Sequence, residues 1–347
     1  MTRQSYRQIE LYEPGRVPVE TDLSDNTNLF GIAPAAFAEL NAPAPMTISR
    51  YPSVFAKDLK RAIAKRFDVA LENITTGCGS DDLIDSAIRA FCEPGDKFAF
   101  PSPTFGVVST FARMNATKPT PVPSNERFEV DVEKLIGAGG AVTYVCSPNN
   151  PTGTVVEREK IERLDARLDG VLLLDEAYAD FSETDYAQFA ARSSRTVSLR
   201  TMSKVYGLAG LRVGYAIGPT DVILEIEKSR GPYKVGGPAE VAASRAIGEN
   251  EDWRRDVVRK TVQNRTRLAG EIDKRGLKQI ASAANFILIL LPPGQDAVAA
   301  NNELRKYGVS TRPFSGLPHV GECLRVTIGP WEMMEKFLNA LDGVIGR

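Results

Sequence analysis

The sequence predicts an α/β protein in which a mostly parallel central sheet, flanked by helices, is joined to a smaller α+β domain. Short apolar runs alternate with segments of helical periodicity through the middle of the 347-residue chain. Strands that are apolar on both faces are typical of a parallel sheet buried between helices. After Gly248 the pattern changes to a long charged segment, which indicates a second unit.

The expected elements of the large unit alternate along the chain. Apolar runs predict strands at 97–100, 142–146, 171–174, 196–199 and 213–217. Helical periodicity between these runs predicts helices near 80–92, 104–115, 157–168 and 221–229. Such alternation favours parallel strands connected by helices.

The small unit is predicted from the C-terminal part of the chain. Residues 251–275 form a long helix whose apolar positions share one face, namely Trp253, Val257, Leu268 and Ile272. Apolar strands follow at 285–290 and 324–328. The first 45 residues, rich in Pro and Asn, are expected to join this unit. We therefore expect a large domain over 46–250 and a small domain made of 1–45 with 251–347.

Composition disfavours several classes of protein. The formal net charge is −1 without a basic block, so we expect neither a nucleic-acid partner nor a membrane partner. The longest apolar run, 286–291, is too short to span a membrane, and the first residues lack the apolar core of a signal peptide. Four cysteines without C-x-x-C or zinc spacing favour reduced thiols in a cytoplasmic protein. With His319 as the only histidine, a metal site built on several histidines is excluded, and no metal is expected.

Two polar turns stand where strands are expected to end, and ligands of open α/β sheets bind beyond the carboxyl ends of strands. The segment "GCGSDDLI" (77–84) places Gly79, Ser80 and Asp81 at a helix start. This is either an ordinary N-cap or a phosphate site formed by exposed amides. The segment "CSPNNPTGT" (146–154) is either a plain tight turn or a turn that presents the amide of Asn150 to a ligand.

Two further segments carry charged groups. In "VLLLDEAYADF" (171–181) a buried strand ends in Asp175, which either caps the next helix or serves as a permanent anion opposite a protonated ring nitrogen. The segment "TMSKVYGLAGLRVGYAIG" (201–218) contains the polar residues Thr201, Ser203, Lys204 and Arg212. The lysine is either an exposed loop residue or a desolvated nucleophile beside a phosphate site. A covalent lysine, an aspartate and a phosphate cradle together are what pyridoxal 5′-phosphate needs, so we predict that cofactor.

These segments resemble the fold-type-I, aspartate-aminotransferase-like enzymes, and most closely the histidinol-phosphate aminotransferase family. The resemblance runs from about Leu11 to Gly329, and "NNPTG", "DEAYADF" and "SKVYGLAGLRVGY" carry it. It implies that Lys204 binds the cofactor covalently and that Asp175 pairs with the pyridine nitrogen. It further implies that Asn150 and Tyr178 contact the ring hydroxyl and that Phe105 stacks on the ring. The residues implied at the cofactor phosphate are Gly79, Ser80, Asp81, Thr201, Ser203 and Arg212, with Tyr51 of "RYPS" reaching the site of a partner subunit.

The resemblance also implies a substrate site. "LYEPG", "VSTRPF" and "LRVTIG" match the segments that give Tyr12, Arg312 and Arg325, although the last is also readable as a solvated strand face. Asn28 of "NTNLFG" is also expected to bind the substrate, although this segment departs from the family pattern. Further departures are Phe105, where a tyrosine is usual, and Gly236. These departures affect the substrate pocket more than the cofactor site.

We therefore predict a homodimeric aminotransferase with shared active sites. Its amino donor is expected to be histidinol phosphate or a related amino acid, with 2-oxoglutarate as the acceptor and Lys204, Asp175 and Tyr178 in the chemistry. The alternatives are an aromatic or other amino-acid aminotransferase, a threonine-phosphate decarboxylase-like enzyme, and a cofactor-free regulatory protein. A hydrolase is disfavoured because the sequence has neither G-x-S-x-G nor S-x-x-K.

Overall fold

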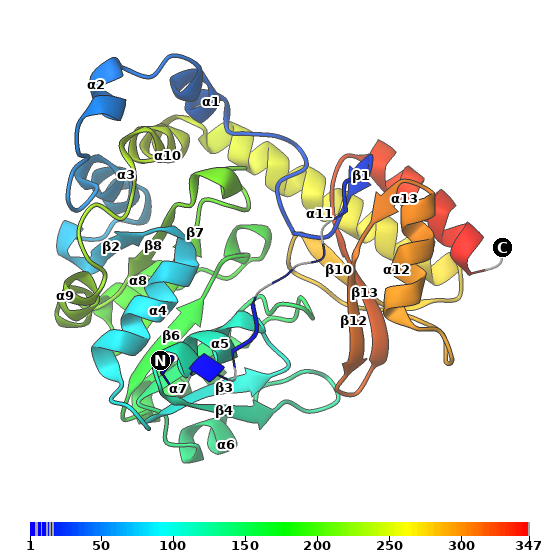
Figure 1. The fold of residues 1–347 in the computed structure, drawn as a ribbon, viewed down its shortest axis with the longest axis horizontal. Coiled ribbons are helices and arrows are strands. Elements are labelled where there is room, and N and C mark those ends of the chain that lie inside the picture. The colour runs from blue at the N-terminus through cyan, green and yellow to red at the C-terminus, as the bar shows by residue number, and fades with distance from the viewer. Residues whose placement is uncertain (4–5, 8, 12, 14, 16, 346–347) are drawn as a thin grey trace.

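The computed structural model describes residues 1–347 apart from 4–5, 8, 12, 14, 16 and 346–347. Figure 1 shows a large unit around one sheet and a smaller unit at the right of the view. The long helix α11 (Glu251–Lys274) runs from one unit to the other. The predicted α/β class with a smaller α+β part is confirmed.

Within the described residues, the large sheet has seven strands in the order β2-β8-β7-β6-β5-β3-β4. Strand β8 is antiparallel to its neighbours β2 and β7, and the other pairs are parallel. The strands are β2 (Ile74–Gly77), β3 (Lys97–Ser102), β4 (Lys118–Pro123), β5 (Val142–Cys146), β6 (Val171–Asp175), β7 (Thr196–Thr201) and β8 (Gly214–Ile217).

All five predicted strands of this sheet are present, but β2 and β4 were not predicted. β2 is four residues long and includes two threonines and a glycine, so it lacks a long apolar run. β4 has proline at every second position. Proline cannot donate a backbone hydrogen bond, and β4 tolerates it because β4 lies at the edge of the sheet.

Helices cover both faces of the large sheet, as expected for buried parallel strands. One face packs against α4 (Gly79–Phe91), α5 (Val107–Met114) and α9 (Thr220–Ser229). The other face packs against α3 (Lys57–Phe67), α6 (Val132–Gly137), α7 (Arg158–Arg167), α8 (Ala187–Arg192) and α10 (Gly237–Glu249). Along β5, Tyr144 faces the first group and Val145 the second, which is the alternation of a strand.

The small unit is an antiparallel sheet in the order β12-β13-β10-β9, covered by α11 and two further helices. The predicted long helix is confirmed, and Val257, Leu268 and Ile272 are buried on it. The elements are β9 (Lys278–Ile280), β10 (Phe286–Leu290), α12 (Ala297–Lys306), β12 (Arg312–Leu317), β13 (Gly321–Thr327) and α13 (Trp331–Val344).

The N-terminal segment contacts both units. Strand β1 (Thr21–Asp22) pairs in parallel with β11 (Val309–Ser310) of the small unit. Helix α1 (Pro34–Asn41), followed by the short α2 (Pro45–Ser49), packs instead against α10 of the large unit. The domain boundaries at residues 46 and 250 therefore stay a prediction.

Candidate active site

A cavity of about 620 Å³ lies at the carboxyl ends of β5, β6 and β7. Asp175 ends β6, Thr201 ends β7, and Asn150 lies in the turn after β5. Parallel strands deliver their last residues to one edge of the sheet, so segments far apart in the chain meet there. The residues predicted at the cofactor that line this cavity are Ser80, Asp81, Phe105, Asn150, Asp175, Tyr178, Thr201, Ser203, Lys204 and Arg212.

One end of the cavity is built to hold an anion. The Arg212 guanidinium reaches the first turn of α4 and donates to Asp81 Oδ2 at 3.2 Å. Gly79 makes this approach possible, because a Cβ at that position would lie 2.6 Å from Arg212 Nη2. The hydroxyls of Thr201 and Ser203 lie 2.9 Å apart in the same cavity. A guanidinium, hydroxyls and a helix N-terminus together suit a phosphate.

Asp175 is a buried carboxylate with a defined set of donors. It is 4% exposed, and burial raises its pKa to about 6. The Tyr144 hydroxyl donates to Asp175 Oδ2 at 2.7 Å, and the Ala177 amide donates to Oδ1 at 3.0 Å. The helix-cap explanation does not apply, because the residues after β6 form a turn and a short 3₁₀ segment (Ala179–Phe181).

The amine of Lys204 is partly shielded from solvent. Its Nζ donates to the Asp25 carbonyl at 3.2 Å and lies 5.5 Å from the centre of the Tyr178 ring. Burial, followed by the nearby charge of Arg325, lowers the Lys204 pKa to about 8. About a tenth of this amine is therefore neutral, and nucleophilic, at pH 7, far more than for an ordinary lysine.

The small unit contributes Arg325 to the same site. Arg325 comes from β13 and is 6% exposed, so the solvated strand face is excluded for this residue. Its guanidinium donates to Asn150 Oδ1 at 2.6 Å and to the Ser24 carbonyl at 2.7 Å. Tyr178, which accepts a hydrogen bond from Asn26 at 3.1 Å, lines the cavity. Arg325 is not itself a lining residue of the cavity, but its hydrogen bond to Asn150 places it directly against a residue that is.

Arg312 lies directly across from Arg325, on the neighbouring strand. It comes from β12, lines an adjoining cavity of about 210 Å³, and donates to Asp25 Oδ1 at 3.1 Å. Asp25 itself lines the main cavity. The sequence analysis missed Asp25, and the polar run "SDNTN" at 24–28 was the available signal.

Two other predicted residues, Asn28 and Tyr51, do not line the cavity in this single chain. The Asn28 amide donates to the Val205 carbonyl at 2.7 Å and accepts from the Phe30 amide, so it fixes a loop. Tyr51 is 84% exposed and stacks on Tyr233 with ring centres 4.9 Å apart. Tyr12 lies outside the described residues. Their roles stay predictions.

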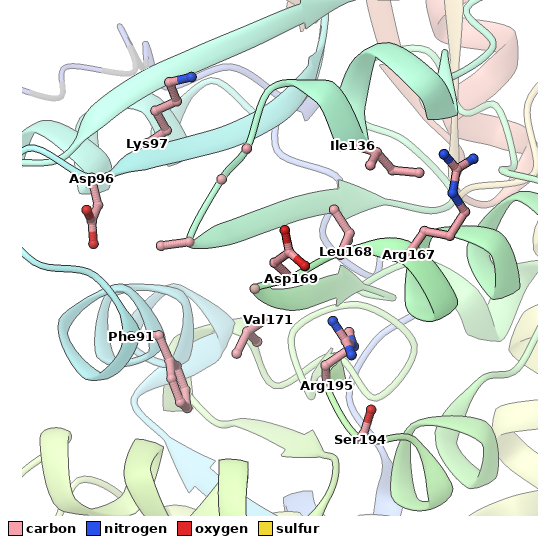
Figure 2. Close-up of a pocket in the computed structure, with 14 residues that line it drawn as sticks. Phe91, Asp96, Lys97, Ile136, Arg167, Leu168, Asp169, Val171, Ser194 and Arg195 are labelled. Atoms are coloured by element: carbon pink, nitrogen blue, oxygen red, sulfur yellow. The ribbon is translucent and has the colours of Figure 1, made fainter.

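A second cavity of about 610 Å³ opens at the opposite edge of the sheet, where β3, β5, β6 and β7 begin (Figure 2). It is lined by backbone at Gly140 and Gly170 and by charges of both signs, including Asp169 and Arg195. Residues predicted at the cofactor do not line it. The two cavities have similar volumes, but only the first lies at the carboxyl ends of the strands and is lined by residues predicted at the cofactor.

The described residues hold neither a metal-binding cluster nor a membrane-spanning helix. Among the described residues, no group of three or more His, Cys, Asp or Glu side chains is arranged to hold a metal ion. None of the described helices combines the length and the apolar character that a membrane crossing requires.

Comparison with known proteins places these features in a family. Residues 18–341 match the model of the family described as aminotransferase class I and II. The histidinol-phosphate aminotransferase of Roseiflexus castenholzii is 36% identical over 94% of this chain and 91% of its own length. Histidinol-phosphate aminotransferase 1 of Nostoc sp. is 32% identical over 96% of this chain and 95% of its own length.

Solved structures show the same fold. A histidinol-phosphate aminotransferase from Sinorhizobium meliloti, in complex with pyridoxal-5′-phosphate, aligns with a TM-score of 0.89 at 23% identity, over 99% of this chain and 97% of that one. An L-threonine-O-3-phosphate decarboxylase from Porphyromonas gingivalis aligns with a TM-score of 0.82 at 23% identity, over 94% of this chain and all of that one (100%). The fold alone therefore does not separate transamination from decarboxylation.

Proposed function

Since this chain belongs to the class I and II aminotransferase family, we propose that it uses pyridoxal phosphate to move an amino group from histidinol phosphate, or a related amino acid, to 2-oxoglutarate. The family that the sequence resembles is thereby confirmed. The observation that carries the proposal is that the Lys204 amine, the Asp175 carboxylate and the Arg212 guanidinium line one cavity.

The donor set of this cavity fits pyridoxal phosphate. Arg212, Ser203 and the first turn of α4 would hold the phosphate, which is dianionic at neutral pH. Asp175 would hold the protonated ring nitrogen, and Phe105 would cover a ring face. Asn150 and Tyr178, on the remaining side, carry polar groups suited to the ring hydroxyl.

The residues of the chain then have separate tasks. When bound, the cofactor supplies a ring that withdraws electrons from the substrate carbon. The Lys204 Nζ takes the proton from the substrate Cα and returns it later, a task that suits an amine with a pKa of about 8. Asp175 keeps the ring-nitrogen proton in place. The Arg325 guanidinium, held by Asn150 and Ser24, binds the carboxylate of the oxo acid through its fork.

The proposed amino donor follows from the positive charges of Arg312 and Arg325. Arg312 and Arg325, with Tyr12, would receive the phosphate end of histidinol phosphate, because two guanidinium groups match a dianion. The relatives from Roseiflexus castenholzii and Nostoc sp. carry that substrate in their names. The geometric support is that Arg312 and Arg325 both approach the segment 24–25 from adjacent strands.

One observation favours a second candidate, an aromatic or other amino-acid aminotransferase. The Asp25 carboxylate already neutralises Arg312, with 3.1 Å between Oδ1 and Nη2. A phosphorylated donor has to compete with this carboxylate, whereas an uncharged aromatic donor does not. The Asp25–Arg312 pair is therefore the feature on which substrate choice depends.

We also propose a homodimer in the cytoplasm. The surface around Tyr51 exposes Met46, Ile48, Phe55 and Tyr233, and exposed apolar residues in one region mark protein contacts. A two-fold dimer across this surface would bring Tyr51 to the cofactor phosphate of the partner subunit. The cytoplasm is supported by the four cysteines, which are all free thiols.

A donor screen tests the proposed function. Purified protein loaded with pyridoxal phosphate is given 2-oxoglutarate and, in turn, histidinol phosphate, phenylalanine and threonine phosphate. Glutamate formed fastest with histidinol phosphate supports the proposal, and preference for phenylalanine supports the second candidate. Carbon dioxide released from threonine phosphate without glutamate identifies a decarboxylase. A protein that gains no visible absorbance band with the cofactor contradicts all three.

A further inference from the structure

A buried tyrosine is hydrogen-bonded to the aspartate of the site from the neighbouring strand. Tyr144 lies on β5 and Asp175 ends β6, and the register pairs Cys146 with Asp175. Because side chains alternate along a strand, Tyr144, Cys146 and Asp175 share one face of the sheet. The Tyr144 ring extends toward the carboxyl edge, and its hydroxyl reaches Asp175 Oδ2 at 2.7 Å.

Both groups are shielded from water. Tyr144 is 0% exposed and packs near Phe98, with ring centres 6.5 Å apart, and Asp175 is 4% exposed. A buried carboxylate is stable as an anion where donors replace its lost hydration. Here the donors are the Tyr144 hydroxyl on Oδ2 and the Ala177 amide on Oδ1. One donor on each oxygen fixes the plane of the carboxylate while Asp175 still lines the cavity.

The environments of Tyr144 and Asp175 determine which of them donates the hydrogen bond. Burial and the Asp175 charge raise the pKa of Tyr144 well above its ordinary value, so the phenol keeps its proton and acts as the donor. Burial raises the Asp175 pKa to about 6, and the Tyr144 hydrogen bond acts against this rise. The Ala177 amide and the charge of Lys204 also lower the Asp175 pKa, whereas the charge of Asp81 raises it, and these three contacts are the same in the Tyr144→Phe variant. Without that bond, a larger fraction of Asp175 is protonated at neutral pH and cannot hold a protonated ring nitrogen.

We propose that Tyr144 is a positioning residue that orients Asp175 and keeps it ionised before the cofactor arrives. The inference rests on the proposed function, since the partner of Asp175 is the ring nitrogen of the cofactor. A tyrosine that only fills the core would contribute packing through its ring, and loss of its hydroxyl would leave cofactor binding equally pH-dependent. The pH dependence of cofactor binding therefore separates the two roles.

The test measures binding of pyridoxal phosphate to the cofactor-free full chain between pH 5.5 and 8.5, followed by absorbance. For Tyr144→Phe we expect the dissociation constant to rise roughly tenfold near pH 6 and to approach that of the wild type above pH 8. The pH below which cofactor binding weakens should be higher in this variant than in the wild type, because the Asp175 pKa rises.

Tyr186→Phe is the matched control. Tyr186 is 0% exposed, and its hydroxyl has no hydrogen-bond partner in the described part of the chain. This variant should bind the cofactor as the wild type does at every pH. A second comparison uses the Asp175→Asn background, in which adding Tyr144→Phe should leave the pH dependence unchanged, because the group whose pKa Tyr144 controls is gone while Lys204 titrates alike in both variants.

Each outcome has a defined meaning. Equal binding curves for Tyr144→Phe and the wild type overturn the inference, as does a uniform weakening at all pH values, which a packing role produces. A shift that persists in the Asp175→Asn background also overturns it. A wild type that binds no pyridoxal phosphate at any pH contradicts the proposed function itself, and is thereby distinguished from failure of the role of Tyr144.

Discussion

The carboxylate of Asp25 accepts a hydrogen bond from the Arg312 guanidinium at 3.1 Å, while its own backbone carbonyl accepts one from Lys204 Nζ at 3.2 Å. One residue of the N-terminal segment thus joins the reactive amine to an arginine of the small unit. The backbone contact is independent of the side chain, so the two contacts respond differently to mutation.

Asp25→Asn should favour phosphorylated donors. The substitution leaves the carbonyl bonded to Lys204 in place but removes the charge that competes for Arg312. We expect KM for histidinol phosphate to fall by about tenfold, with KM for phenylalanine changed by less than about threefold. Steady-state kinetics with both donors measures this. Equal changes for the two donors would show that Asp25 does not govern access to Arg312.

Arg312→Ala should act in the opposite direction. Arg312 is half-buried, and loss of a charged partner of a bound dianion costs roughly 2–5 kcal/mol in binding, so the preference for histidinol phosphate over phenylalanine should collapse. The measured quantity is the ratio of kcat/KM for the two donors. A wild type that already prefers phenylalanine contradicts the phosphate assignment and supports the aromatic candidate.

Asp175→Asn should reduce the rate by far more than it reduces cofactor content. An amide cannot hold the ring-nitrogen proton, and losing a buried charge partner costs several kcal/mol, roughly 3–5. The comparison is kcat per bound cofactor, so that weaker loading is not mistaken for slower chemistry. Activity within about tenfold of the wild type would exclude this role for Asp175.

Lys204 should make the cofactor-free chain less stable at neutral pH than at high pH. Its pKa is lowered to about 8 in the folded chain from an ordinary 10.5, so the unfolded chain binds more protons between these values. Stability therefore rises through this window. Lys204→Met should be more stable than the wild type at pH 7 by about 1–2 kcal/mol, an estimate reduced because the side chain is half-buried. Urea unfolding at pH 7 and pH 10 measures the gap, and a gap that widens with pH would contradict the lowered pKa.

How far the sequence predicts this molecule depends on the kind of contact. Five strands of the large sheet are local apolar runs and were predicted, whereas β2 is too short and polar to stand out and β4 is hidden by prolines that an edge position tolerates. Lys204, Asp175 and Arg212 were predicted because each stands in a short motif at a strand end. The Tyr144–Asp175 bond joins residues 31 positions apart, and the sequence does not state which strands are neighbours. Asp25 was missed for the same reason, since its partner Arg312 is 287 positions away.

The measurement closest to the central claim is the position of the covalent cofactor. The protein is loaded with pyridoxal phosphate, reduced with borohydride, digested and analysed by mass spectrometry, alongside Lys204→Ala as the control. We predict the modification on the peptide that contains Lys204, and none on the variant, because the Lys204 amine has a pKa of about 8 and lines the same cavity as Asp175. Modification that maps to another lysine, or that persists in Lys204→Ala, would contradict the account.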